Sequence, residues 1–325
     1  MSDDRQDEFQ ADEIKVGEWT PATEPLPGDS YERPSSRVPH LGHTFLLLAI
    51  AGLFLMLSQV VLLVPVLHGG TSTALLHPKR LLGAEAATYL ATLAICWFLF
   101  PLLWHRSFLA GIEWHGATAL RLAGKLIPLG ILTGWTVQAI SSLISMPKSV
   151  PMDNFFRSAS DIWIVTLFGT LLAPLFEEIC FRGFLLPAFT IAFDWLGPWL
   201  RYTVQFSLAR MRDEQPPEHI FALREERSAG LAPDTGNMAF RSMPAIVLSS
   251  VVTSALFGLL HAQQLGYTWT AVLLLGAVSL VLTVVRIRTR SLACSTLVHS
   301  SYNLSVFLVL FIATGGYRHL DRLAR

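Results

Sequence analysis

The stretch that decides the fold is FLLLAIAGLFLMLSQVVLLVPVL, residues Phe45–Leu67, which contains no charged residue. A bilayer core of about 30 Å is crossed by about 20 apolar residues in a helix, so this stretch is long enough to span a membrane. The whole chain agrees: 52% of its 325 residues are hydrophobic, 15% are charged, and the mean hydropathy is +0.48. An average soluble domain carries about 25% charged residues, so the composition excludes a disordered chain, a nucleic-acid binder and most soluble enzymes.

Further apolar runs of this length follow along the chain and predict seven spans. An eighth span over Gly183–Leu200 is less favoured, because Pro187, Asp194 and Pro198 interrupt it, and we interpret this stretch as a continuation of the fourth helix toward the membrane surface. The predicted fold class is all-α, a polytopic membrane bundle of about seven to eight transmembrane helices. The seven spans are Phe45–Leu67, Ala86–Trp104, Leu126–Met146, Trp163–Phe176, Pro244–Leu260, Trp269–Val285 and Leu292–Thr314.

Two polar segments lie outside these spans. Residues 1–40 carry ten acidic and four basic side chains, are rich in Pro, and predict a disordered cytoplasmic tail. Residues 41–317 are assigned to one transmembrane domain, whose core motifs fall within 161–314 and whose polar insert at 201–243 must lie outside the membrane. Nothing in the tail resembles a signal peptide, so we expect the first span to act as the targeting signal.

The distribution of basic residues predicts the orientation. With a cytoplasmic N-terminus, seven spans place most arginines and lysines inside, among them Arg286, Arg288 and Arg290, as the positive-inside rule requires. This distribution favours a multi-pass membrane protein with a cytoplasmic N-terminus, surrounded by membrane lipid. We separately expect the membrane to be a bacterial plasma membrane. Its three cysteines all fall in apolar stretches and predict no disulfide framework.

Charged groups within the apolar fourth segment need a physical reason, because each one costs about 2.5 to 3.5 kcal/mol to insert. Arg182 follows Glu178 by one helical turn, so these two residues predict a structural ion pair. Glu177 points about 100° around the helix and lacks that partner, which fits a desolvated carboxylate acting as a base. The alternative is that both acids simply mark a helix end at the membrane surface.

Three further polar residues are candidates for the same site. His261 closes the run that ends in Phe257-Gly-Leu-Leu-His261, and an antiparallel hairpin could bring it to the depth of Glu177. His299 and Asn303 are four residues apart and share one face of the last span. They could instead be hydrogen-bonding contacts between packed helices. His299 is only eight residues into its predicted span, so residue counting does not match its depth to that of Glu177.

The ordered motifs Glu177-Glu178-Ile-Cys-Phe-Arg182, Phe257-Gly-Leu-Leu-His261 and His299-Ser-Ser-Tyr-Asn303 resemble the EExxxR, FxxxH and HxxxN motifs of one family. This is the CPBP family of intramembrane, metal-independent glutamic proteases, also called the Abi family, which includes the CAAX prenyl endopeptidases. The resemblance covers about half of the chain. The insert at 201–243 departs from the short connection that is usual in the family; it leaves the three motifs intact, and we expect it to alter substrate access.

The resemblance implies an intramembrane endopeptidase whose substrate is a membrane-associated protein or peptide. Glu177 and His261 would activate a water, and His299 and Asn303 would stabilise the oxyanion. Glu178 and Arg182 would order the first motif, and Phe257 would pack the second. It implies no cofactor and no metal. It does not identify the substrate, and the oligomeric state cannot be predicted.

Two other interpretations stay open from the residues alone. Glu and His also bind zinc, so a metal-dependent hydrolase fits the same residue types, although no HExxH sequence is present. A non-catalytic membrane protein, such as an immunity or scaffold protein or a small transporter, could use the same polar cluster for binding. Substitution of Glu177 and a chelator distinguish these readings from a glutamic protease.

Overall fold

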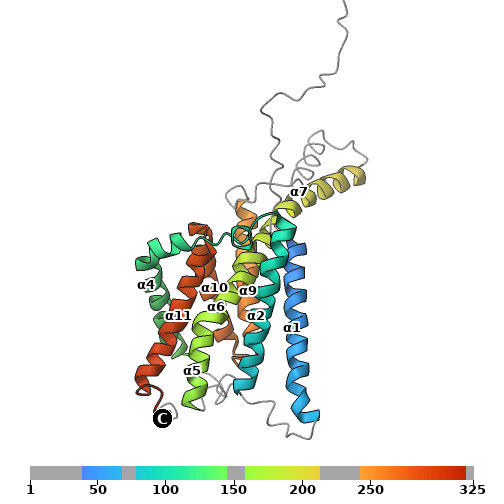
Figure 1. The fold of residues 1–325 in the computed structure, drawn as a ribbon. Coiled ribbons are helices and arrows are strands. Elements are labelled where there is room, and N and C mark those ends of the chain that lie inside the picture. The colour runs from blue at the N-terminus through green and yellow to red at the C-terminus, as the bar shows by residue number, and fades with distance from the viewer. Residues whose placement is uncertain (1–38, 68–77, 145–157, 213–241, 320–325) are drawn as a thin grey trace, which may run out of the picture. The chain divides into compact units, whose positions relative to one another are not determined.

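Long helices form the part of the chain that the structure, a computed structural model, describes: residues 39–67, 78–144, 158–212 and 242–319. No strand occurs in these ranges, and the described residues belong to one unit, Ser35–Arg325. The helices, shown in Figure 1, are α1 (Leu41–Leu67), α2 (Pro78–Trp104), α3 (Phe108–Gly111), α4 (Gly116–Ser141), α5 (Ala159–Leu167), η3 (Phe168–Leu172), α6 (Ala173–Glu178), η4 (Ile179–Leu185), α7 (Leu186–Met211), α9 (Met243–Leu260), α10 (Trp269–Thr289) and α11 (Leu292–Ala313).

Six helical segments are long and apolar enough to cross a membrane, which confirms the prediction of an integral, polytopic helical bundle. They are α1, α2, the run from α5 to α7, α9, α10 and α11. The span predicted at Leu126–Met146 is not among them. Its helix, α4, begins earlier and includes Arg121 and Lys125, and it ends at Ser141. Even so, α4 lies alongside α11 in the bundle (Figure 1).

The stretch Gly183–Leu200 continues the fourth helix, as the sequence predicts, and does not form a separate span. η4 passes into α7 without a break, and α7 runs on to Met211. The first eleven residues of the predicted polar insert, 201–211, are therefore helical. The predicted tail at 1–38 and the remainder of the insert at 213–241 lie outside the described residues.

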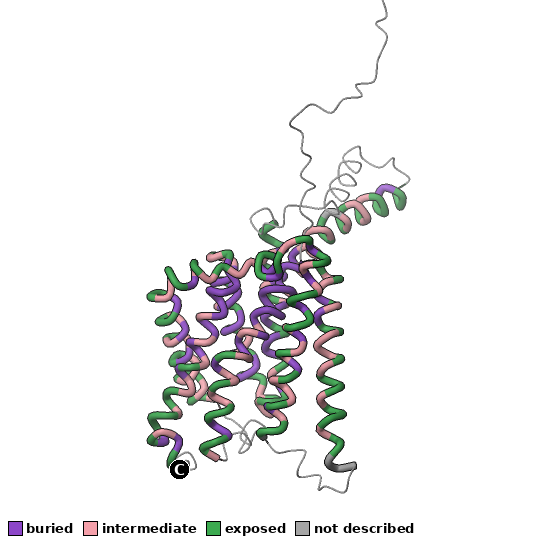
Figure 2. Tube along the Cα trace, viewed as in Figure 1, coloured by how far each residue is buried: buried purple, intermediate pink, exposed green. Residues whose placement is uncertain are grey.

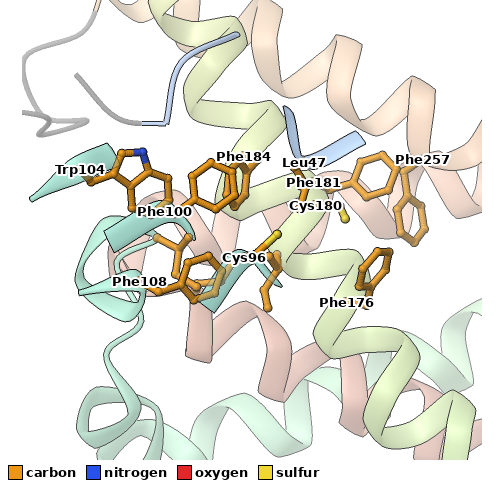
Figure 3. Close-up of a cluster of buried hydrophobic side chains, with 13 residues drawn as sticks. Leu47, Cys96, Phe100, Trp104, Phe108, Phe176, Cys180, Phe181, Phe184 and Phe257 are labelled. Atoms are coloured by element: carbon orange, nitrogen blue, oxygen red, sulfur yellow. The ribbon is translucent and has the colours of Figure 1, made fainter. Parts of the chain in front are cut away.

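An aromatic cluster fills the centre of the bundle, where α2, η4 and α9 meet (Figure 3). The rings of Phe100 and Trp104 stack with centroids 4.6 Å apart, and Phe184 lies 4.9 Å from Phe100. On the other side of η4, Phe181 meets Phe257 edge to face at 5.1 Å. Figure 2 shows that buried residues gather in the half of the bundle where α11 begins. The first motif thus lies in the best-packed part of the protein.

Two glycines allow α4 to approach α11 closely. A Cβ atom on Gly130 would lie 2.5 Å from the carbonyl oxygen of Val298, and one on Gly134 would collide with the hydroxyl of Ser305. Small residues four apart are a common way for membrane helices to pack backbone to backbone. The pair therefore fixes α11, the helix that carries His299, against α4.

We expect Gly130→Ala to destabilise the protein by about 1 to 3 kcal/mol, because the backbone of α11 must move away from the added methyl group. Gly124→Ala, in the same helix, is the matched control, since a Cβ there meets no atom within 4 Å. Unfolding of the purified protein in mixed micelles measures both. Equal stability of the two variants would contradict the close packing of α4 on α11.

Candidate active site

An ion pair between Glu178 and Arg182 lies inside the bundle, as the sequence predicts. Arg182 Nη1 donates to Glu178 Oε1 at 2.8 Å, and both side chains are fully buried. Arg182 Nη2 donates to the carbonyl oxygen of Ser279 at 2.8 Å and to its hydroxyl at 2.6 Å. Buried charges are tolerated when they are paired and hydrogen-bonded, and these contacts supply both conditions. The ion pair therefore joins η4 to α10.

The imidazole of His299 lies between two carboxylates. Its Nδ1 is 3.0 Å from Glu178 Oε1, and its Nε2 is 3.7 Å from Glu177 Oε2. An ionised carboxylate only accepts hydrogen bonds, so Nδ1 carries the proton that binds Glu178. The side chain of Glu177 is 20% exposed, whereas that of Glu178 is fully buried. The first and third motifs thus meet, and Glu177 is the carboxylate that remains accessible.

The depths of Glu177 and His299 match, because their helices run in opposite directions. Glu177 stands 18 residues after Ala159 at the start of α5, and His299 stands seven residues after Leu292 at the start of α11. At 1.5 Å per residue these positions are about 27 Å and about 11 Å from opposite ends of the bundle. The residues therefore meet near the end where α11 begins, and residue counting on the predicted spans was wrong about a mismatch.

Two π-helical segments, η3 and η4, stand on either side of the short helix that carries the glutamates. In a π-helix each carbonyl accepts from the amide five residues later. Pro174 stands five residues after Gly169 and has no amide hydrogen, so the Gly169 carbonyl lacks that partner. Asn303 Nδ2 donates to this oxygen at 2.6 Å. Asn303 is therefore tied to η3, one turn along α11 from His299.

Phe257 connects the second motif to the other two. Its ring is 3% exposed and lies 4.7 Å from the ring of His261 and 5.9 Å from that of His299. The guanidinium of Arg182 lies over the same ring, 5.1 Å from its centroid. His261 Nδ1 is 2.8 Å from the carbonyl oxygen of Phe257, which can only accept, so this nitrogen carries the proton. In the neutral ring, Nε2 of His261 is then a hydrogen-bond acceptor.

The seven predicted residues are thus connected in two ways. Six are joined directly by ion pairs, hydrogen bonds or ring contacts: Glu177, Glu178, Arg182, Phe257, His261 and His299. Asn303 joins the group through the backbone of η3.

The sequence analysis missed two polar residues of α2. The hydroxyl of Tyr89 donates to Glu85 Oε1 at 2.7 Å, and the ring of Tyr89 stacks on Phe176 with centroids 3.9 Å apart. Phe176 directly precedes Glu177, so Glu85 and Tyr89 lie beside the first motif. Glu85 stands one residue before the uncharged run from which the second span was predicted. A lone glutamate at the edge of an apolar run was the signal that could have revealed it.

A metal site needs several His, Cys, Asp or Glu side chains close together, and the structure describes residues 39–67, 78–144, 158–212 and 242–319. No group of three or more His, Cys, Asp and Glu side chains in those ranges could hold a metal ion.

One comparison with known proteins bears on this site. Residues 159–305 match the Rce1-like family, described as type II CAAX prenyl endopeptidase Rce1-like. The matched stretch contains all seven predicted site residues and all three motifs. It ends before the last turns of α11 and excludes α1, α2 and α4. No curated protein and no solved structure matches the chain. The resemblance found in the motifs is thereby confirmed.

We expect Arg182→Met to destabilise the protein by about 3 to 5 kcal/mol, because Glu178 would keep a buried charge without its partner. Replacing both, as Glu178→Leu with Arg182→Met, should recover much of this loss. Arg288→Met, at an exposed position of α10, is the control and should change stability by about 0.5 kcal/mol or less. Unfolding in mixed micelles compares the three variants. A double variant less stable than Arg182→Met would contradict the argument.

Proposed function

Residues 159–305 of the bundle match the Rce1-like, type II CAAX prenyl endopeptidase family, and from this premise we propose that the protein is a metal-independent, glutamic-type intramembrane endopeptidase. It hydrolyses a peptide bond of a membrane-associated protein or peptide, near the membrane surface. The observation that carries the proposal is the position of His299 between Glu177 and Glu178, at 3.7 Å and 3.0 Å. Residues from separate motifs thereby form one polar cluster within an apolar bundle.

In the proposed reaction, Glu177 and His261 activate a water molecule. Glu177 is the more accessible of the two adjacent carboxylates and takes the proton as the water attacks the scissile carbonyl. When the tetrahedral intermediate collapses, the C–N bond breaks and Glu177 gives this proton to the leaving amine nitrogen. Nε2 of His261 can accept a hydrogen bond from the same water, because Nδ1 already donates to the Phe257 carbonyl. The contact between Phe257 and both histidines supports a fixed orientation of His261.

The oxyanion is stabilised by His299 and Asn303. When Nε2 of His299 is also protonated, the imidazolium faces Glu177 on one side and Glu178 on the other. The charges of Glu177, Glu178, Arg182 and His299 then sum to zero, which suits a site removed from water. Asn303 has a second amide hydrogen beyond the one given to Gly169. Donors of this kind act most strongly in a water-poor cavity.

The substrate is a segment that can reach this cluster from the lipid phase or from the membrane surface. A peptide bond in the membrane is accessible only where its backbone is unwound and its polar groups find partners. A lipid anchor would hold such a segment at the surface, and the name of the matched family points to a prenylated C-terminus. We place the protein in a bacterial plasma membrane with a cytoplasmic N-terminus.

Glu177→Gln should lower the rate of cleavage by about 10² to 10⁴-fold, the usual contribution of a general base. The measurement compares peptide termini in membrane fractions of cells that express the wild type or the variant, each with and without a metal chelator. New termini that need Glu177 and survive the chelator would support the proposal and identify the substrate.

The same comparison contains the outcomes that reject the proposal. Identical termini in both strains, with each protein folded and present, would favour a non-catalytic role in binding or immunity. Termini that disappear with the chelator would instead indicate a metal-dependent hydrolase. Equal melting temperatures of the wild type and Glu177→Gln establish that a loss of cleavage is not a loss of folding.

Glu85→Gln should lower kcat/KM by about tenfold, equivalent to about 1.4 kcal/mol of barrier. Glu85 accepts the hydrogen bond that holds Tyr89, and the ring of Tyr89 stacks on Phe176, the residue before Glu177, so loss of the carboxylate loosens the support of Glu177. Tyr89→Phe should act in the same direction and less strongly, since it removes only the hydroxyl that holds Glu85. Tyr267→Phe, at an exposed position, is the control. An unchanged kcat/KM for Glu85→Gln would show that α2 does not contribute to the catalytic site.

A further inference from the structure

The helix that follows the glutamates is far longer than a single crossing requires. The run Ala159–Met211 has 53 residues. At 1.5 Å per residue it extends for about 80 Å of helix, against a hydrocarbon core of about 30 Å. The part up to Leu185 already crosses the bundle, so the far half of α7 cannot remain in the same crossing. Figure 1 shows this half extending outward from the end of the bundle.

One face of this far half is apolar and uncovered. Leu196, Leu200, Val204, Leu208 and Met211 are spaced by four, four, four and three residues, and their exposed fractions are 38%, 52%, 46%, 46% and 83%. At 100° per residue they fall within an arc of about 120°. We call these five residues the α7 stripe. Such a stripe needs an apolar environment that the described helices do not supply.

Two arginines stand on the two sides of the α7 stripe. Arg210 and Arg212 are both exposed, and each lies about 100° from the centre of the stripe, on opposite sides. No acidic residue occurs from Trp195 to Arg212, so this part of the helix is positively charged. An apolar face between exposed arginines is typical of helices that lie in the surface of a membrane.

We propose that Leu196–Met211 lies in one leaflet, at the boundary between acyl chains and headgroups, with Arg210 and Arg212 binding the headgroups of anionic phospholipids. The α7 stripe faces the acyl chains, and the long arginine side chains reach outward to the phosphate groups. A bilayer is the occupant that fits, because the same helix leaves the membrane-spanning bundle at this point. This lipid contact holds the helix that continues, through η4, to Arg182.

The test uses the full chain in phosphatidylcholine vesicles with and without phosphatidylglycerol, whose acyl chains are brominated. A fluorescent nitrobenzoxadiazole label is attached to Val204→Cys on the stripe or to Tyr202→Cys on the opposite face. The native cysteines, 0 to 7% exposed, give the background in the wild type treated with the same reagent. We expect bromine to quench most of the fluorescence at position 204 and little at position 202. Leu208→Cys replaces Val204→Cys if that variant does not fold.

The arginines are tested in the labelled Val204→Cys protein by adding Arg210→Glu and Arg212→Glu. Phosphatidylglycerol should increase quenching in the parent and have no such effect in the charge-reversed variant. Equal quenching at positions 202 and 204, or none at 204, would overturn the membrane placement. If quenching at position 204 falls as the protein-to-lipid ratio rises, a second copy of the chain covers the α7 stripe, and the membrane placement is overturned. An unchanged phosphatidylglycerol effect after charge reversal would overturn the headgroup assignment.

Discussion

The buried ion pair between Glu178 and Arg182 is the interaction on which the site depends. Neither charge could remain in an apolar bundle alone, and each has further partners: Ser279 for the guanidinium and His299 for the carboxylate. These contacts bring α10 and α11 onto the helix of the glutamates. Glu177, the next residue, is thereby held at a fixed position with its carboxylate still accessible. One buried, ion-paired carboxylate thus positions a second one that remains accessible.

Irregular helix geometry gives this arrangement its remaining contacts. A regular α-helix would satisfy its own backbone and would offer the carbonyl of Gly169 to no side chain. The π-helical turn and the missing amide of Pro174 release that oxygen, and Asn303 binds it. π-helical segments occur often at functional sites. The π-helical turn that interrupts the helix beside the glutamates therefore also fixes α11 to that helix.

The sequence predicted much of this, because membranes constrain helices strongly. Span lengths follow from bilayer thickness, and charged residues such as Glu177 in apolar runs stand out against their surroundings. What failed was the counting of uncharged runs. It began the second span at Ala86, one residue after Glu85, and gave α4 too short and too apolar a helix, because Arg121 and Lys125 were left out. The π-helical turns depend on backbone bonds over several turns, which side-chain patterns do not report.

The residues outside the family match complete the site physically. The matched stretch, 159–305, supplies the three motifs, yet the ring that stacks on Phe176, the residue before Glu177, is that of Tyr89 in α2, which also holds Glu85. The close approach of α4 to α11 likewise depends on Gly130, which also precedes the match. The packing that holds the motifs in place therefore extends beyond the matched stretch, to α2 and α4.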